Sequence, residues 1–69
     1  MPDSVYKVIE LIGSSPDSWE NAATNAVERA GQNLRDLRVA KLVEQDLKVE
    51  DGKITGFRVR LKLSYKFED

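Results

Sequence analysis

The chain has 69 residues, a formal net charge of −1 and neither cysteine nor histidine. This length supports one domain over residues 1–69, which would bury only about 60% of its unfolded surface. Disulfides and the usual zinc ligands are excluded, so association between copies is the remaining source of stability. The charge argues against a nucleic-acid partner. The chain contains no apolar run long enough for a membrane span and no signal core, so we expect a cytoplasmic protein with no membrane partner.

The first elements in chain order are a strand and a helix. The segment VYKVIELI, residues 5–12, is rich in β-branched and aromatic residues and ends at Gly13, which predicts a strand. Ser15 as N-cap and Pro16 at the first helical position predict a helix over about residues 16–35. Its apolar stripe consists of Trp19, Ala22, Ala23, Ala26, Val27, Ala30 and Leu34. We expect Trp19 to pack the helix start against the sheet or a neighbouring copy.

Two long alternating segments follow the helix, at residues 38–50 and 54–67, on either side of EDGK. This pattern predicts a β-hairpin. A three-residue loop, Glu50 to Gly52, would place Glu44 opposite Arg58, Val43 opposite Val59, and Val39 opposite Leu63. The last strand directs one apolar row to the core, made up of Phe57, Val59, Leu61, Leu63, Tyr65 and Phe67.

The element order predicts an α+β fold, in which a three-stranded sheet packs on one amphipathic helix. A right-handed crossover would place the first strand parallel to its neighbour in the sheet. Strands of some 14 residues would run about 45 Å, whereas a compact globule of this size has a radius of gyration near 11 Å. The strands should therefore overhang the helix, and another copy of the chain should cover their ends.

The sequence does not indicate an enzyme. It lacks histidine and cysteine, the commonest general base and the best intrinsic nucleophile. It also has no glycine-rich phosphate-binding loop. Ser14 and Ser15 have no evident base partner and suit a loop and a helix cap instead.

Two segments, VYKVIELIGSSPDSWENAATNAVERA and LRDLRVAKLVEQD, together with the alternating last strand, resemble the dodecin family. The resemblance covers residues 5 to about 67 and implies a β-α-β-β protomer, twelve copies of which form a hollow shell. It also implies flavin storage or buffering rather than catalysis, with flavins stacked between tryptophans of two subunits. Some members hold coenzyme A or metal ions, and one branch binds calcium. The pieces SP-x-SWE, RVA and EQD place this chain nearest that branch.

The resemblance also indicates the positions of a flavin site, and this chain departs from the family there. Val39 stands in place of the stacking tryptophan, and Arg58 in place of the flavin-bonding glutamine. Asp46 stands where some members carry a phosphate-binding arginine, while Lys66 keeps a basic group and Glu44 an acidic one. Valine offers no π-face for stacking, and arginine cannot accept a hydrogen bond. We expect a Glu44–Arg58 ion pair to fill part of the pocket.

Three functions follow as alternatives. The favoured one is a shell that binds or sequesters a small ligand or cation, with calcium as the candidate. Asp17 and Glu20, at the helix start, are the candidate metal ligands, although the helix dipole also explains their position. The second is storage of FMN or riboflavin, and the third is a purely structural shell.

Overall fold

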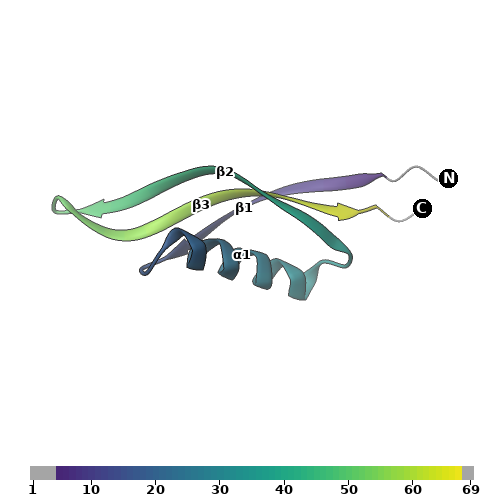
Figure 1. Ribbon diagram of the computed structural model, residues 1–69, viewed down its shortest axis with the longest axis horizontal. Coiled ribbons are helices and arrows are strands. Elements are labelled where there is room, and N and C mark those ends of the chain that lie inside the picture. Colours follow the sequence, from purple (N-terminus) through teal and green to yellow (C-terminus); the bar gives the residue numbers. More distant parts are fainter. Residues whose placement is uncertain (1–4, 68–69) are drawn as a thin grey trace.

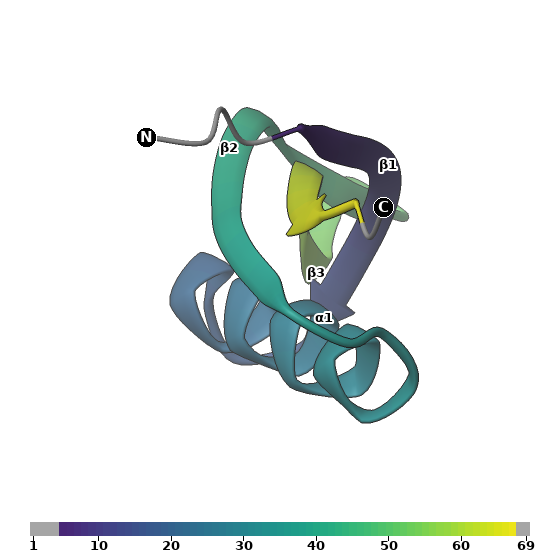
Figure 2. The same cartoon turned by 90° about the vertical axis from the view of Figure 1, so that its right-hand side faces the viewer.

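The computed structural model describes residues 5–67. Its elements follow the expected order: β1 (Tyr6–Ser15), α1 (Trp19–Asn33), β2 (Leu37–Glu50) and β3 (Lys53–Lys66). The strands form one sheet in the order β1-β3-β2, and α1 covers one face of it (Figure 1). The end-on view shows the sheet curving over the helix (Figure 2). The predicted α+β class and β-α-β-β order are therefore confirmed.

The predicted parallel pairing of the first strand is wrong. β1 pairs with β3 in antiparallel fashion, from Tyr6 opposite Lys66 to Ser15 opposite Phe57. β1 and β2 do run in the same direction, as a crossover through α1 requires, because both are antiparallel to β3. The hairpin, however, places β3 between them. The chain is thus a split β-α-β unit, in which the parallel strands are not neighbours.

The helix begins three residues later than the predicted cap indicates. Ser18 is the N-cap, and its hydroxyl accepts from the Asn21 N–H at 3.0 Å. Ser15 instead ends β1 and is only 4% exposed. Its hydroxyl donates to Asn21 Oδ1 and accepts from the Asp17 N–H, both at 2.9 Å. The helix ends at Asn33, and Leu34 is its C-cap.

Small residues bring the helix close to the sheet. Ala22, Ala26 and Ala30 are buried against a row of β3, which consists of Val59, Leu61 and Leu63. Trp19, Ala23, Val27 and Leu34 pack around this core, which confirms the predicted helix stripe and the part of the predicted apolar row from Val59 to Leu63. Phe67, at the end of that predicted row, lies outside β3 and is 49% exposed. Gly13 of β1 completes the contact, because a Cβ there would meet the carbonyl oxygen of Ala22 and lie 2.9 Å from Ala26 Cβ.

The hairpin closes through a two-residue turn rather than the predicted three-residue loop. Glu50 pairs with Lys53, and the residues between them, Asp51 and Gly52, have φ values of 52° and 72°. Positive φ at both positions is the mark of a type I′ turn, whose twist matches that of the strands. Asp-Gly is one of the dipeptides that favour this turn.

The register of β2 on β3 shifts at three places. Thr55 of β3 and both Val43 and Arg38 of β2 have no direct partner, so each is an extra residue in the ladder. Every cross-strand pair predicted from a regular ladder is therefore wrong. The observed pairs at the positions considered above are Glu44 with Arg60, Gln45 with Val59, Asp46 with Arg58, Ala40 with Leu63, and Val39 with Ser64. After each bulge, the side chains that follow point to the opposite face of the sheet from the one that a regular alternation predicts.

The protomer is elongated. Its radius of gyration is 14.4 Å and its extents are 54 × 20 × 14 Å, whereas a compact chain of this length would have a radius near ~11 Å. Every residue of β2 after Leu37 is exposed. The predicted overhang of the strands beyond the helix is confirmed. Within residues 5–67, no helix has the length and apolar character needed to cross a membrane.

Candidate functional site

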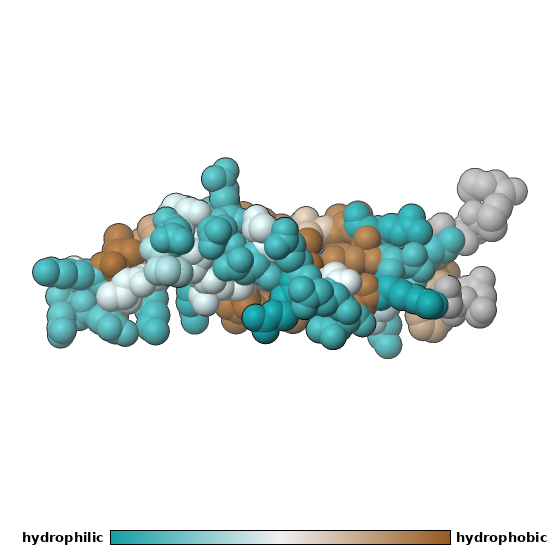
Figure 3. Space-filling view, turned by 90° about the horizontal axis from the view of Figure 1, so that it is seen from below, coloured by the Kyte–Doolittle hydropathy of each residue, from teal (hydrophilic) through white to brown (hydrophobic). Residues whose placement is uncertain are grey.

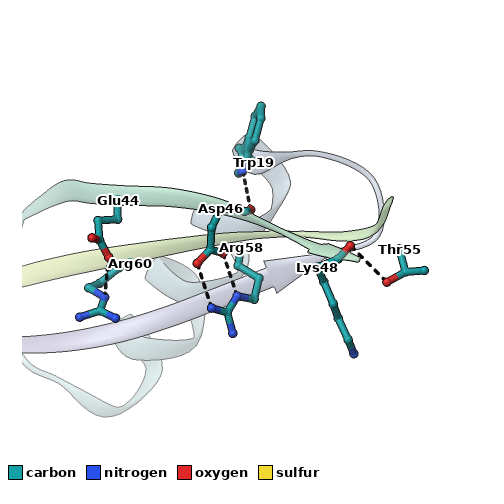
Figure 4. Close-up of polar contacts among 7 residues, drawn as sticks. All are labelled: Trp19, Glu44, Asp46, Lys48, Thr55, Arg58 and Arg60. Carbon is teal, nitrogen blue, oxygen red and sulfur yellow. Dashed lines mark hydrogen bonds and ion pairs between the residues drawn. The ribbon is translucent and has the colours of Figure 1, made fainter. Parts of the chain in front are cut away.

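The polar face of the sheet carries two cross-strand ion pairs between β2 and β3. Arg58 donates from Nε and Nη2 to Oδ1 and Oδ2 of Asp46, at 2.8 and 2.9 Å. Arg60 Nε lies 3.3 Å from Glu44 Oε1. Figure 4 shows the two pairs along the hairpin. The predicted Glu44–Arg58 pair is wrong, because the two-residue turn and the extra residue Thr55 each shift the register by one position and bring Asp46 opposite Arg58.

The two partners of the bidentate pair affect each other's ionisation. The hydrogen bond from Arg58 lowers the pKa of Asp46, and the same bond raises the pKa of Arg58. Both side chains are about half exposed, so solvent screens the attraction and the pair contributes little to stability. Its main effect is geometric, because two parallel bonds hold Arg58 flat against Asp46.

Asp46→Asn should make the free energy of unfolding fall less steeply at acidic pH. The lowered pKa means that Asp46 stabilises the fold above its ordinary pKa of about 3.8, and that this contribution is lost as the pH falls through the folded value. We expect the variant to have a slightly lower free energy of unfolding at neutral pH and a flatter decline of that free energy below about pH 4. Urea unfolding over a series of pH values measures both. Asp51→Asn, at a turn carboxylate without an ion pair within residues 5–67, is the control. An identical pH profile for Asp46→Asn and the wild type would contradict the prediction.

The five positions matched to the flavin site do not meet within one protomer. Val39 is 55% exposed and faces Ser64, and Lys66 lies two residues beyond Ser64. Arg58 is six residues from Ser64 along β3, which is about 20 Å. Glu44 and Asp46 lie with Arg58, so the positions form one cluster near the hairpin and another near the far end of β3. Only contact between copies could unite them.

The space beside the Arg58–Asp46 pair is small. A depression of about 10 Å³ lies among Ile12, Glu44, Asp46, Arg58, Val59 and Arg60. A single water molecule needs about that volume. This depression, as the described residues form it, is therefore too small to hold an aromatic ring.

A larger groove, not predicted from the sequence, lies between α1 and β2. Its volume is about 490 Å³. We call it the helix–β2 groove, and its lining includes Trp19, Ala23, Val27, Ala40, Leu42, Gln45, Val59 and Leu61, with Glu20, Thr24 and Glu28 at the helix side. Most apolar residues of the segment 38–50 have odd numbers and would share one face of a regular strand, but Ala40 and Leu42 have even numbers. This departure from the alternation is the sequence signal that could have indicated the groove. The bulge at Val43 turns this pair toward the helix.

Trp19 holds the helix start onto the sheet. Its Nε1 donates to the carbonyl oxygen of Asp46 at 3.1 Å (Figure 4). Its ring meets Phe57 edge to face, with centroids 5.3 Å apart and planes at 79°. The predicted packing role of Trp19 is confirmed.

A calcium ion would find no complete site in one protomer. Calcium takes six to eight oxygen ligands, and residues 5–67 contain no cluster of three potential metal-ligating side chains. Asp17 and Glu20 are both exposed near the start of α1. Glu44 and Asp46 are already paired with arginines. A cation site built from these residues would need carboxylates from several copies.

Comparison with known proteins points to one family. The family model described as Dodecin matches residues 5–68. The calcium dodecin of Mycobacterium tuberculosis is 55% identical over 64 residues, which span 91% of this chain and 89% of that protein. Among solved structures, the dodecin from Streptomyces coelicolor has a TM-score of 0.91 at 38% identity, over 100% of this chain and 99% of that one.

The crystal structure of the M. tuberculosis calcium dodecin, described as a calcium-chelating antigen, has a TM-score of 0.83 at 52% identity, over 94% and 93% of the two chains. The agreement extends over sequence, fold and nearly the full length of each relative. The chain belongs to the dodecin family.

Proposed function

We propose that copies of this chain assemble into a dodecin shell of twelve that binds or sequesters calcium, and that the shell is not an enzyme. The observation that carries the choice of ligand is the bidentate Arg58–Asp46 pair. It occupies the position matched to the flavin-bonding glutamine, while Val39 stands in place of the stacking tryptophan. A relative of 55% identity is a calcium dodecin, which supports the cation.

The cation would be held between copies. Carboxylates gathered around a symmetry axis repel one another, and a divalent cation with many oxygen ligands relieves that repulsion. Asp17 and Glu20 are the candidates, because both are exposed and neither forms an ion pair within residues 5–67. Asp46 is a poor general base, since Arg58 holds it as a paired carboxylate.

Calcium binding should be measurable on chelator-treated protein. The wild type should elute as an assembly of twelve chains of 7.8 kDa, about 94 kDa by light scattering. Calorimetric titration with calcium should give saturable binding, and free calcium at 100 times Kd should stabilise the fold by about 2.7 kcal/mol. The double variant Asp17→Asn/Glu20→Gln should bind at least about 10-fold more weakly, a loss of about 1.4 kcal/mol.

The control for this titration is Asp51→Asn, which removes one carboxylate of the turn and should bind as the wild type does. A wild type that shows neither heat nor stabilisation with calcium would overturn the cation proposal. If the assembly is intact under those conditions, a purely structural shell is the function that remains. A monomer would overturn the shell itself.

Flavin should bind poorly. Stacking on an aromatic side chain contributes about 1–3 kcal/mol per ring, and Val39 supplies none. FMN fluorescence should show no strong, saturable quenching with the wild type. Val39→Trp/Arg58→Gln should gain about 10- to 100-fold in affinity, and Val39→Leu/Arg58→Gln should not, because leucine is apolar without a π-face. Strong quenching by the wild type would favour FMN or riboflavin storage instead.

A further inference from the structure

Two lysines lie on the face of the sheet that is turned away from α1, which we call the outer face. Leu61 and Leu63 of β3 are buried against the helix, on the side of the sheet where Figure 3 shows exposed hydrophobic side chains. Because side chains alternate along a strand, Lys62 between them points to the outer face. On β2, Leu42 lines the helix–β2 groove, so the neighbouring Lys41 also lies on the outer face.

These two lysines break a row of ion pairs between β2 and β3. The Asp46–Arg58 and Glu44–Arg60 pairs described above join charges of opposite sign. The next pair on the outer face is Lys41 directly opposite Lys62. Like charges directly opposite each other destabilise a sheet. The fold therefore places two positive charges side by side at the position that follows two neutralised pairs.

The bulge in β2 is the reason for this juxtaposition. If the register of the two ion pairs continued without the extra residue Val43, Leu42 would stand opposite Lys62. The extra residue instead brings Lys41 to that position. The two ammonium groups are thus held together by the backbone, which a change of side-chain rotamer cannot undo.

Other side chains leave a positive charge at this pair. Both lysines are exposed, and neither forms an ion pair within residues 5–67. Glu10 of β1 stands opposite Lys62 on its other side, but it too forms no ion pair in that part of the chain. One carboxylate offsets one of the two positive charges. Ser64, the next outer-face residue of β3, is half-buried and supplies a hydroxyl donor.

We propose that Lys41 and Lys62 together bind a phosphate group, as inorganic phosphate or as a phosphate monoester. A dianion between the two ammonium groups replaces their mutual repulsion by two attractions. Each ammonium group has three N–H donors for the phosphate oxygens, and such charge-assisted hydrogen bonds are strong. Ser64 adds a third donor from the same face. The inference is independent of the calcium proposal.

Phosphate binding should be measured on the assembled wild type in calcium-free buffer at about pH 8, where phosphate carries two charges. Calorimetric titration at constant ionic strength should give saturable binding. Phosphate should also raise the urea midpoint more than sodium chloride of the same ionic strength does, because chloride only screens the repulsion. Absence of saturable heat, with equal effects of the two salts on the midpoint, would overturn the proposal.

Neutral substitutions locate the site. Lys41→Gln and Lys62→Gln should each weaken phosphate binding about 10-fold, because each removes one charged donor. Lys53→Gln is the matched control, since it removes the same charge from β3 about 30 Å away and should leave binding unchanged. Glu10→Gln should tighten binding, because it removes the carboxylate opposite Lys62. An equal loss in Lys41→Gln, Lys62→Gln and Lys53→Gln would reduce the effect to net charge and overturn the site.

Charge reversal tests the repulsion itself. Lys41→Glu completes the row of ion pairs, so in phosphate-free buffer its urea midpoint should exceed that of the wild type. The midpoint of this variant should no longer respond to phosphate beyond the effect of chloride. Lys62→Glu makes the same change on the other strand and replaces it if Lys41→Glu fails to fold by circular dichroism. A folded variant that keeps the wild-type response to phosphate would contradict the proposal.

Inorganic phosphate and glycerol 3-phosphate distinguish the two sources of the group. Tighter binding of the free ion identifies inorganic phosphate, and tighter binding of the ester identifies a phosphate monoester. Binding of neither would overturn the proposal. Calcium binding is read in a separate titration, so a failure of either proposal leaves the other standing.

Discussion

Replacing Gly13 by alanine should lower the free energy of unfolding by about 1–3 kcal/mol or more, although it adds a single methyl group. The added Cβ would meet the backbone carbonyl of Ala22 and come within 2.9 Å of Ala26 Cβ. Neither atom is the end of a flexible side chain, so the helix itself would have to move away from the sheet. That movement would also loosen the packing of Ala26 on the apolar row of β3.

Gly31→Ala is the matched control for this substitution. Gly31 also lies in the chain's regular structure, but a Cβ there would meet nothing within 4 Å. Alanine has the higher helix propensity, so Gly31→Ala should raise stability by up to about 1 kcal/mol. Urea unfolding of both variants at one protein concentration checks the pair, since stability of an assembly depends on concentration. Equal effects of the two substitutions would contradict the close contact at Gly13.

Trp19→Ala should cost about 3 kcal/mol, the lower end of the range for large aromatic residues, because Trp19 is only half-buried. The substitution removes the edge-to-face contact with Phe57 and the hydrogen bond to the carbonyl oxygen of Asp46. It also frees the hairpin at Asp46 and Phe57, the positions next to residues 47–55, from the helix. We expect the amides of residues 47–55 to lose protection from hydrogen exchange first.

Trp19→Phe separates the two contributions. It keeps a ring against Phe57 and loses only the indole N–H, so it should cost about 1 kcal/mol, the usual net value of one hydrogen bond. The difference between the alanine and phenylalanine variants, measured by urea unfolding, reports the packing of the ring. An alanine variant as stable as the wild type would mean that Trp19 does not hold the helix to the sheet.

Local periodicity was sufficient to predict the elements and the core. The helix stripe from Trp19 to Leu34 and the alternation from Phe57 to Tyr65 depend only on 3.6- and 2-residue repeats, which neighbouring residues determine. The cap was less certain from sequence, because Ser15 and Ser18 are both good N-caps. Tertiary structure selected Ser18, since Ser15 is buried as the last residue of β1.

Strand register decided what the sequence left open about the site. The bulges at Thr55 and Val43 are not visible in a regular alternation, yet they change which side chains face one another and which face the helix. Arg58 consequently pairs with Asp46 rather than Glu44, and Leu42 turns into the groove while Val43 does not line it.

The sequence by itself therefore determined the elements, their order, the apolar faces and the overhang of the strands, because these follow from local patterns and from the surplus length of the strands. The tertiary structure alone decided the place of β1 beside β3, the ion pairs and the helix–β2 groove. Those features depend on contacts between residues far apart in the chain. A single extra residue in one strand reverses the faces of all that follow it.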